Sequence, residues 1–160
     1  TEILLLQKLK NKKQMKKNFK TIILSATVAA MALVSSCTKT CDPGYEGSDC
    51  KTAMNTKFSG TYAVKDTASS ADTTLYFNYS MTVSSPSSEP AKVNISNFGG
   101  FGSGTTISGT VDGTSLKLDN TTLAGVQISN ATGTISGSKL AFTYTSNDGT
   151  AFTSHAVGTK

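Results

Sequence analysis

The stretch Thr74–Ser84, TLYFNYSMTVS, decides the fold, because apolar and polar residues alternate along it. One face of this stretch would carry Leu75, Phe77, Tyr79, Met81 and Val83. The other face would carry Thr74, Asn78, Ser80, Thr82 and Ser84, and Tyr76 is the one exception to the alternation. Successive side chains of a strand point to opposite faces, so the pattern predicts an antiparallel strand with one face in a core.

The same period-two alternation recurs on both sides of this stretch. It is carried by Phe58, Tyr62 and Val64; Val93 and Ile95; Ile107 and Val111; Leu116 and Leu118; Val126 and Ile128; and Leu140, Phe142 and Tyr144. Turn signals lie between these runs, at Asp112-Gly113, Asp119-Asn120, Ser129-Asn130, Ser136-Gly137-Ser138 and Asp148-Gly149. Ser84–Pro90 is expected to be a polar loop and Phe98–Gly104 a flexible one.

About eight or nine strands therefore follow one another, roughly eight to twelve residues apart and with no helical pattern between them. This predicts an all-β domain, an antiparallel up-and-down meander of about eight strands, closed as a barrel. A β-sandwich is the alternative. Gly109, Gly125 and Gly133 interrupt predicted strands and are expected to mark bulges or bends that closure needs.

Phe58–Tyr62, FSGTY, resembles the start of lipocalin-like and calycin domains, where a G-x-W motif lies, and Tyr62 takes the tryptophan position. The resemblance implies an eight-stranded barrel whose interior holds a small hydrophobic ligand. The candidate ligand-binding residues are Phe77, Tyr79, Ile95 and Phe142. A packed interior without a ligand is the alternative.

The lysines are unevenly distributed along the chain. Residues 1–36 contain seven of the fifteen lysines and one acidic residue, Glu2. Residues 37–160 contain eight lysines and nine acidic residues, a formal charge of −1. The sequence pI of about 9.1 therefore reflects the N-terminal segment and does not indicate a nucleic-acid-binding surface.

The N-terminal segment has the pattern of a signal peptide. Met15–Lys20, MKKNFK, is cationic, and Thr21–Val34 is an apolar run of 14 residues. Such a run has the length of a signal-peptide hydrophobic region and is too short to span a bilayer. We therefore expect residues 1–36 to be a helical signal peptide whose natural start is Met15.

Val34-Ser35-Ser36-Cys37 follows the apolar run and resembles the lipobox of bacterial lipoproteins. In that family an aliphatic residue and two small residues precede the cysteine that becomes acylated. The resemblance implies cleavage before Cys37 and a membrane anchor of lipid on this residue. Thr38, in the next position, is similar to an outer-membrane address of Gram-negative bacteria, with the protein facing the periplasm or the cell surface. A plain secretory signal and an uncleaved anchor helix are the alternatives.

Cys41–Cys50 reads C-x-x-G-Y-x-G-x-x-C and is similar to the last disulfide loop of an EGF-like module. With Cys37 lipidated, Cys41 and Cys50 are the two remaining thiols, and we expect them to pair in an oxidising exported compartment. Residues 37–56 are interpreted as lipid anchor, disulfide loop and tether, and residues 57–160 as the barrel-like domain.

The sequence offers no set of residues that could form a catalytic centre. His155 is the single histidine, and no serine lies in a G-x-S-x-G motif. We therefore expect neither an enzyme nor a metal or cofactor. Two hypotheses remain: an envelope lipoprotein whose barrel binds a small hydrophobic ligand, and a structural or interaction lipoprotein whose solid β domain binds an envelope protein or glycan.

Overall fold

The structure, a computed structural model, describes residues 40–160. The predicted signal-peptide helix, the predicted start at Met15 and the predicted lipidation site Cys37 lie outside the described residues. Cys41–Lys160 form one compact unit. Every strand pair of the described sheets lies within this unit, so we expect it to fold without residues 1–40.

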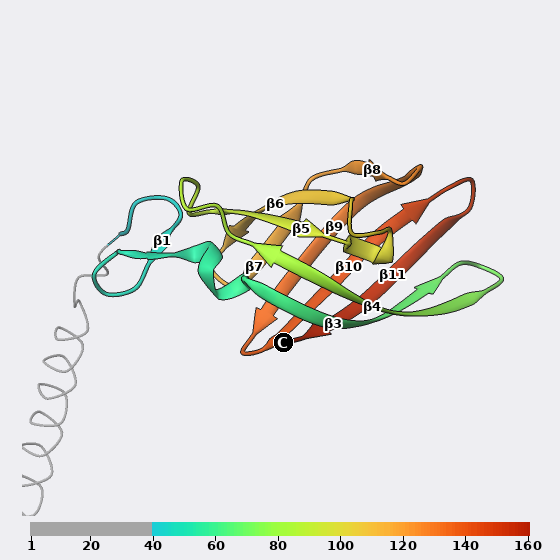
Figure 1. The fold of residues 1–160 in the computed structure, drawn as a ribbon, viewed down its shortest axis with the longest axis horizontal. Helices are drawn as coiled ribbons and strands as arrows, with labels where there is room; N and C mark the ends of the chain where they lie inside the picture. The colour runs from blue at the N-terminus through green and yellow to red at the C-terminus, as the bar shows by residue number, and fades with distance from the viewer. Residues whose placement is uncertain (1–39) are drawn as a thin grey trace, which may run out of the picture. The chain divides into compact units, whose positions relative to one another are not determined.

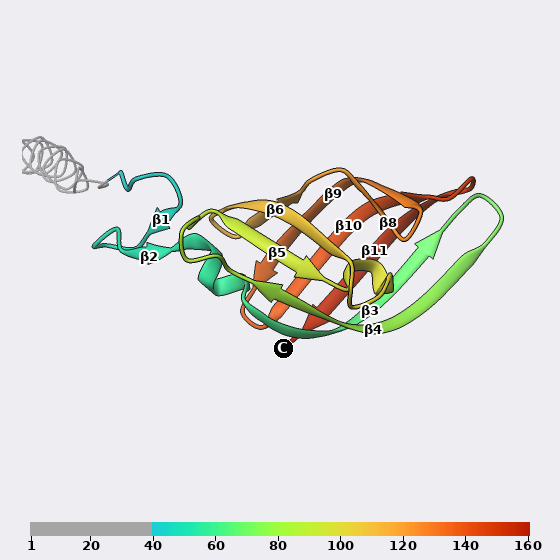
Figure 2. The same cartoon turned by 45° about the horizontal axis from the view of Figure 1, so that its top comes forward.

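The regular elements of the described chain are β-strands and two 3-10 segments (Figures 1 and 2). In chain order these are β1 (Tyr45–Glu46), β2 (Thr52–Ala53), η1 (Met54–Phe58), β3 (Gly60–Ser69), β4 (Thr74–Ser84), β5 (Lys92–Ser96), η2 (Phe98–Gly100), β6 (Thr106–Asp112), β7 (Ser115–Leu118), β8 (Thr121–Leu123), β9 (Val126–Ser136), β10 (Lys139–Asn147) and β11 (Ala151–Thr159).

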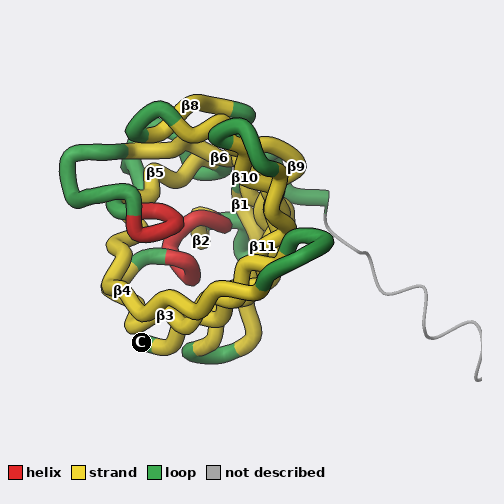
Figure 3. The backbone as a smooth tube through the Cα atoms, turned by 90° about the vertical axis from the view of Figure 1, so that its right-hand side faces the viewer, coloured by secondary structure: helices red, strands yellow, loops and turns green. Residues whose placement is uncertain are grey.

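The main sheet has nine antiparallel strands and closes on itself. Its order is β10-β11-β3-β4-β5-β6-β7-β9-β8, and a further pairing joins β10 to β9. β8 pairs with β9 at the end of that order, so the other eight strands form a closed up-and-down barrel. Viewed along the barrel, the strands form a ring around η1 and η2 (Figure 3). The predicted all-β barrel is thus confirmed, and the sandwich alternative is wrong.

The barrel closes because its strands alternate as the sequence predicts. Tyr62 and Val64 on β3, and Met81 and Val83 on β4, are buried, while their neighbours along each strand are exposed. The inward-facing side chains of all eight barrel strands contribute to one hydrophobic core. The interior is therefore packed over much of its length.

The turns between strands agree with the sequence except at Ser129-Asn130. This dipeptide lies inside β9, where the pairing with β10 shifts register and Asn130 adopts a left-handed φ of 54°. It is a bulge and not a turn. Asparagine tolerates this backbone conformation better than most residues, which is also why the dipeptide resembles a turn signal.

η1 fills the end of the barrel that follows the disulfide loop. Phe58 is fully buried beneath the strands. Asn55 is buried as well, and its side-chain amide donates to the carbonyl oxygens of Pro86, Glu89 and Lys92 at 3.2, 2.9 and 2.9 Å. The amide thus holds the loop between β4 and β5 against η1.

A disulfide joins Cys41 and Cys50, whose Cα atoms are 5.1 Å apart, as the sequence predicts. The loop that it closes contacts the barrel directly. Gly44 is buried, and a Cβ at this position would lie 2.9 Å from Pro90 Cγ. No side chain larger than hydrogen fits between the loop and Pro90.

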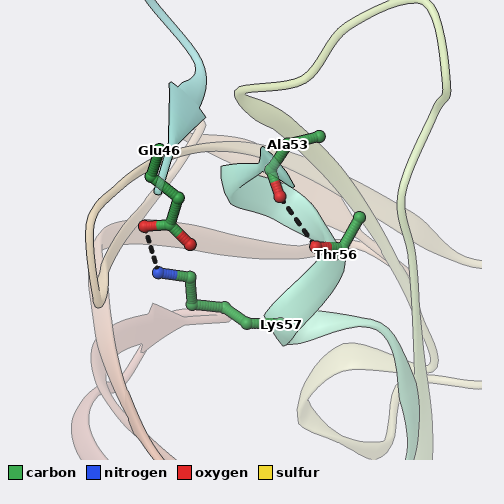
Figure 4. A network of polar contacts seen from close by, with 4 residues as sticks. All are labelled: Glu46, Ala53, Thr56 and Lys57. Carbon is green, nitrogen blue, oxygen red and sulfur yellow. Dashed lines mark hydrogen bonds and ion pairs between the residues drawn. The ribbon is translucent and has the colours of Figure 1, made fainter. Parts of the chain in front are cut away.

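Polar contacts also fasten the disulfide loop to η1 (Figure 4). The ammonium of Lys57 forms an ion pair with Glu46 at 2.6 Å, and the Thr56 hydroxyl donates to the carbonyl of Ala53 at 2.7 Å. The segment interpreted as a tether therefore packs on the barrel from Cys41 onward. This segment belongs to the compact unit Cys41–Lys160, together with the barrel strands.

Tyr62 and Lys160 complete the same end of the barrel. The Tyr62 hydroxyl donates to the Phe58 carbonyl at 2.7 Å, and the Lys160 ammonium lies 5.2 Å from the centroid of the Tyr62 ring. The same ammonium donates to the carbonyls of Lys57 and Ser59 at 2.9 and 2.7 Å. It satisfies carbonyl groups at the end of η1 while its charge interacts with the ring.

η2 enters the barrel near the opposite end. Phe98 is fully buried; its ring centroid lies 5.5 Å from that of Phe142 and 4.8 Å from that of Tyr144. The expectation of a flexible Phe98–Gly104 loop is therefore wrong for its first residues. The apolar side chain of Phe98 gains more by entering the core than the short glycine-rich turn loses in conformational freedom.

Candidate functional site

A cleft lies at the end of the barrel beyond η2, which we call the mouth. Its volume is about 510 Å³, within the range of small-molecule binding sites. The hairpin of β3 and β4 and the hairpin of β10 and β11 both project at this end (Figures 1 and 2). Its walls come from these two hairpins, from η2 and from the start of β9.

The cleft exists because the pairing of the sheet is incomplete at the mouth. β4 pairs with β3 from Thr74 to Val83 but with β5 at Thr82–Ser84 alone. η2 covers the gap, and the side-chain amide of Asn97 donates to the Ser80 carbonyl on β4 at 2.7 Å. Gly100, with a φ of +75°, turns the chain so closely over Tyr79 that a Cβ would lie 3.3 Å from that ring.

The walls of the cleft are largely apolar and aromatic. They include Ala68, Leu75, Tyr76, Phe77, Phe101, Val126 and Phe152. Leu75, Tyr76 and Phe77 are 41%, 76% and 45% exposed, which is unusual for large apolar side chains grouped on one hairpin. Exposed apolar groups of this kind mark binding surfaces more often than isolated ones do.

The floor of the cleft is polar: Tyr79 and Tyr144 are part of its lining, and Asp66 lies beneath their hydroxyls, outside the lining itself. Asp66 is 2% exposed and lies in the inward row of β3, one inward position below Ala68. Its Oδ2 accepts hydrogen bonds from the Tyr144 hydroxyl at 2.5 Å and the Tyr79 hydroxyl at 3.3 Å. Within residues 40–160, its Oδ1 is buried without a hydrogen-bond partner. A buried carboxylate oxygen in this state is rare in folded proteins and calls for a specific explanation, such as a bound partner that completes its hydrogen bonds.

Burial of the two phenols raises the pKa of Tyr79 and of Tyr144 above the usual tyrosine value. The pKa of Tyr79 is raised further by the charge of Tyr144 and then by that of Asp66. The pKa of Tyr144 is raised further by its hydrogen bond to Asp66. Both side chains are therefore neutral hydrogen-bond donors at neutral pH.

The four candidate ligand-binding residues from the sequence are divided between two places. Phe77 and Tyr79 line the cleft. Ile95 is fully buried in the core, and Phe142 is 3% exposed and packs against Phe98. Neither residue is part of the cleft lining.

Sequence reasoning missed Asp66, Tyr144 and Ser154, the last a buried residue of the cleft lining that is hydrogen-bonded to Tyr144. Asp66 occupies the inward row of its strand, two residues after the buried Val64. An acidic residue at an inward position of an alternating strand was the signal that could have found it. Tyr144 was placed in a core row, but its hydroxyl requires a buried partner that the sequence does not indicate.

A second hollow, of about 650 Å³, lies on the outer face of β6, β7, β9, β10 and β11. Its edge carries Val157, which is 46% exposed, and His155, whose ring lies 3.3 Å from the Thr143 hydroxyl. No buried polar atom without a partner is found among the described residues here, because Asp66 Oδ1 is the one such atom in residues 40–160. We therefore regard the mouth as the better candidate for a ligand site.

Residues 40–160 bring no three His, Cys, Asp or Glu side chains together as metal ligands. Within this part of the chain, no helix has the length and apolar character needed to cross a membrane.

No protein-family model and no curated protein matches the chain. Among solved structures, a "putative outer membrane protein" from Bacteroides fragilis is similar, with a TM-score of 0.45 and 20% sequence identity. The similarity covers 68% of this chain and 54% of that chain, so this chain spans little more than half the length of that protein. Similarity at this level supports no functional argument, and the strand pairing alone establishes the barrel.

Proposed function

We propose that this protein is an envelope lipoprotein whose barrel is a non-catalytic binding module for a small hydrophobic ligand. The observation that supports the proposal is the cleft of about 510 Å³ at the mouth, with its apolar walls and polar floor. Much of the barrel interior is filled by the core, so the ligand occupies the mouth and not the centre of the barrel.

The size and lining of the cleft agree with this role. Ligand sites are usually concave and mostly apolar, with a few polar groups that fix orientation. Here the apolar groups are side chains such as Phe77 and Phe152, and the polar groups are the hydroxyls of Tyr79 and Tyr144.

The ligand-binding part of the proposal is tested with Nile red, an uncharged dye that fluoresces in apolar surroundings. Residues 41–160 are produced in an oxidising compartment so that the disulfide forms. We expect saturable fluorescence with a Kd in the micromolar range. An increase that does not saturate, or no increase, would contradict a ligand site at the mouth.

If the dye does not bind, the alternative function is favoured, in which the barrel binds an envelope protein or a glycan. The observation for this alternative is the outer-face hollow with its exposed Val157. The wild-type barrel would then bind this partner. A Val157→Glu variant with the same stability as the wild type would not bind it.

The anchor part of the proposal rests on the lipobox-like Val34–Cys37. It is tested separately by expressing the full chain in a Gram-negative host with labelled palmitate. We expect label on the wild-type protein and its recovery with outer membranes. Label that persists in a Cys37→Ala variant, or is absent from both proteins, would contradict lipidation at this residue.

A further inference from the structure

At the floor of the cleft, the hydrogen-bonding groups that the protein can still offer to a ligand are mainly acceptors. A phenol has one hydrogen to donate, and the hydroxyls of Tyr79 and Tyr144 both direct theirs to Asp66. The Tyr144 hydroxyl is also hydrogen-bonded to Ser154, which is buried. What the two phenols still offer toward the cleft is the remaining lone pairs of their oxygens. A ligand group that donates hydrogen bonds therefore fits this floor, and a group that can only accept does not.

The charge of Asp66 has no cationic partner in the described part of the chain. The one ion pair that residues 40–160 contain joins Lys57 and Glu46, at the opposite end of the barrel. A carboxylate that is 2% exposed and has an unpartnered Oδ1 is costly unless a positive charge lies near it. The mouth of the barrel is the side from which such a charge can come, because the η1 end is closed by the core.

The charge of the cleft lining is negative, like that of the Asp66 carboxylate. Asp148 is the one charged side chain among the described residues that line the cleft, and no lysine or histidine is among them. The lining also includes the aromatic side chains of Tyr76, Phe77 and Phe101, and the π-face of such a ring attracts cations. A fatty acid or other anionic amphiphile would find no positive group here.

We propose that the ligand of this cleft is an amphipathic amine, whose ammonium group lies against Tyr79 and Tyr144 above Asp66 and whose apolar part lies between Phe77 and Phe152. The ammonium donates to the two phenol oxygens and neutralises the buried carboxylate, and the apolar part covers the exposed hairpin residues. This inference rests on the proposed function and adds the chemical class of the ligand.

The experiment compares octylammonium, octanol and octanoate, which share one chain and differ in the head group. Binding to residues 41–160 is measured by isothermal titration calorimetry at neutral pH. We expect octylammonium to bind at least about tenfold more tightly than octanol, and octanoate to bind more weakly than octanol. This comparison needs no variant, so it remains decisive if substitutions disturb folding.

Variants then locate the preference. Asp66→Asn keeps the size of the side chain and removes its charge, and we expect it to bring octylammonium and octanol to within about twofold of each other. Asp112→Asn is the matched control: it removes one exposed carboxylate at the β6–β7 hairpin, away from the mouth, and should keep the tenfold preference. Circular dichroism establishes that each variant is folded.

The outcomes separate the inference from the function on which it rests. Equal binding of the three ligands, or tightest binding of octanol or octanoate, would overturn the amine inference and leave the hydrophobic-ligand function standing. Nile red binding without binding of octylammonium would do the same. If neither the dye nor any octyl ligand binds, both proposals are overturned. A preference for octylammonium that survives in Asp66→Asn would show that Asp66 does not supply it.

Discussion

The Tyr144 hydroxyl donates a hydrogen bond of 2.5 Å to Asp66 Oδ2, although the two residues are 78 positions apart in the chain. The bond crosses from β10 to β3 inside the barrel, with β11 between these strands in the sheet. The same hydrogen bond thus holds the polar groups of the cleft floor in place and joins two strands of the closed barrel. Its removal should therefore affect both the cleft and the stability of the barrel.

Tyr144→Phe should lower the free energy of unfolding by about 1–3 kcal/mol, because the buried Asp66 carboxylate would lose its shorter hydrogen bond. The measurement is urea denaturation followed by circular dichroism. Tyr76→Phe is the control, because Tyr76 is 76% exposed, and it should change stability by less than about 0.5 kcal/mol. Equal effects of the two substitutions would mean that the hydroxyl of Tyr144 is not needed for folding.

Alkaline pH should destabilise the barrel through Tyr79 and Tyr144. Because burial raises the pKa of both phenols in the folded state, the unfolded chain releases these protons first, near the usual value of about 10. Their contribution to stability is complete below pH 10 and is lost as the pH rises from there towards the folded-state pKa values. The limiting slope is about 1.4 kcal/mol per pH unit for each tyrosine.

The measurement is the free energy of unfolding at about pH 9 and about pH 11, compared between the wild type and a Tyr79→Phe/Tyr144→Phe variant. The wild type should lose more stability between the two conditions than the variant does. An equal loss in both proteins would place the alkaline sensitivity in other groups.

Much of this fold could be predicted from the sequence, because the signals that define it are local. The hairpin dipeptide Asp112-Gly113 correctly predicted a turn. The period-two alternation in Thr74–Ser84 correctly predicted a strand, but its predicted core face is buried only at Met81 and Val83, because Leu75 and Phe77 lie beyond the core in the projecting hairpin. Asn130 misled because a left-handed asparagine serves equally well in a turn and in a bulge, and only the partner strand decides between them. A flexible loop was predicted at Phe98 because the glycines next to it suggest mobility. Its ring is instead fully buried in the interior of the barrel, which the local sequence does not indicate.

The site was harder to predict than the fold, since it depends on distant pairs. Phe77 and Tyr79, which line the cleft, stand out in the sequence because they form an aromatic row on one strand face. Asp66 acquires its role only when β4 and β10 bring two phenols to it. Ile95 and Phe142 were selected by the same inward pattern, but the pattern does not show how deep in the barrel a residue lies.

Gly133→Ala should destabilise the barrel by about 1–3 kcal/mol, because the core has no room for a methyl group. A Cβ at this position would lie 2.8 Å from Phe142 Cδ1 and 2.9 Å from the Ala141 carbonyl oxygen. Gly104→Ala is the matched control, since no atom lies within 4 Å of a Cβ there. Thermal unfolding of the two variants checks this, and a Gly133→Ala variant as stable as Gly104→Ala would contradict the tight packing of β9 against β10.

Phe77→Ala should weaken ligand binding while leaving stability nearly unchanged, which separates binding from folding. The Phe77 ring is 45% exposed and faces the cleft, so it contributes little to the core but would be covered by a ligand. Loss of that contact is worth about 1–2 kcal/mol, which corresponds to roughly a 5- to 30-fold increase in the Kd for Nile red.

Val157→Ala is the matched control for Phe77→Ala. Val157 is 46% exposed, nearly the same fraction as Phe77, but lies on the outer face of β11, away from the mouth. Both variants should unfold within about 0.5 kcal/mol of the wild type, and only Phe77→Ala should change the Kd. If Val157→Ala weakens dye binding and Phe77→Ala does not, the ligand binds in the outer-face hollow, and the mouth of the barrel has another purpose.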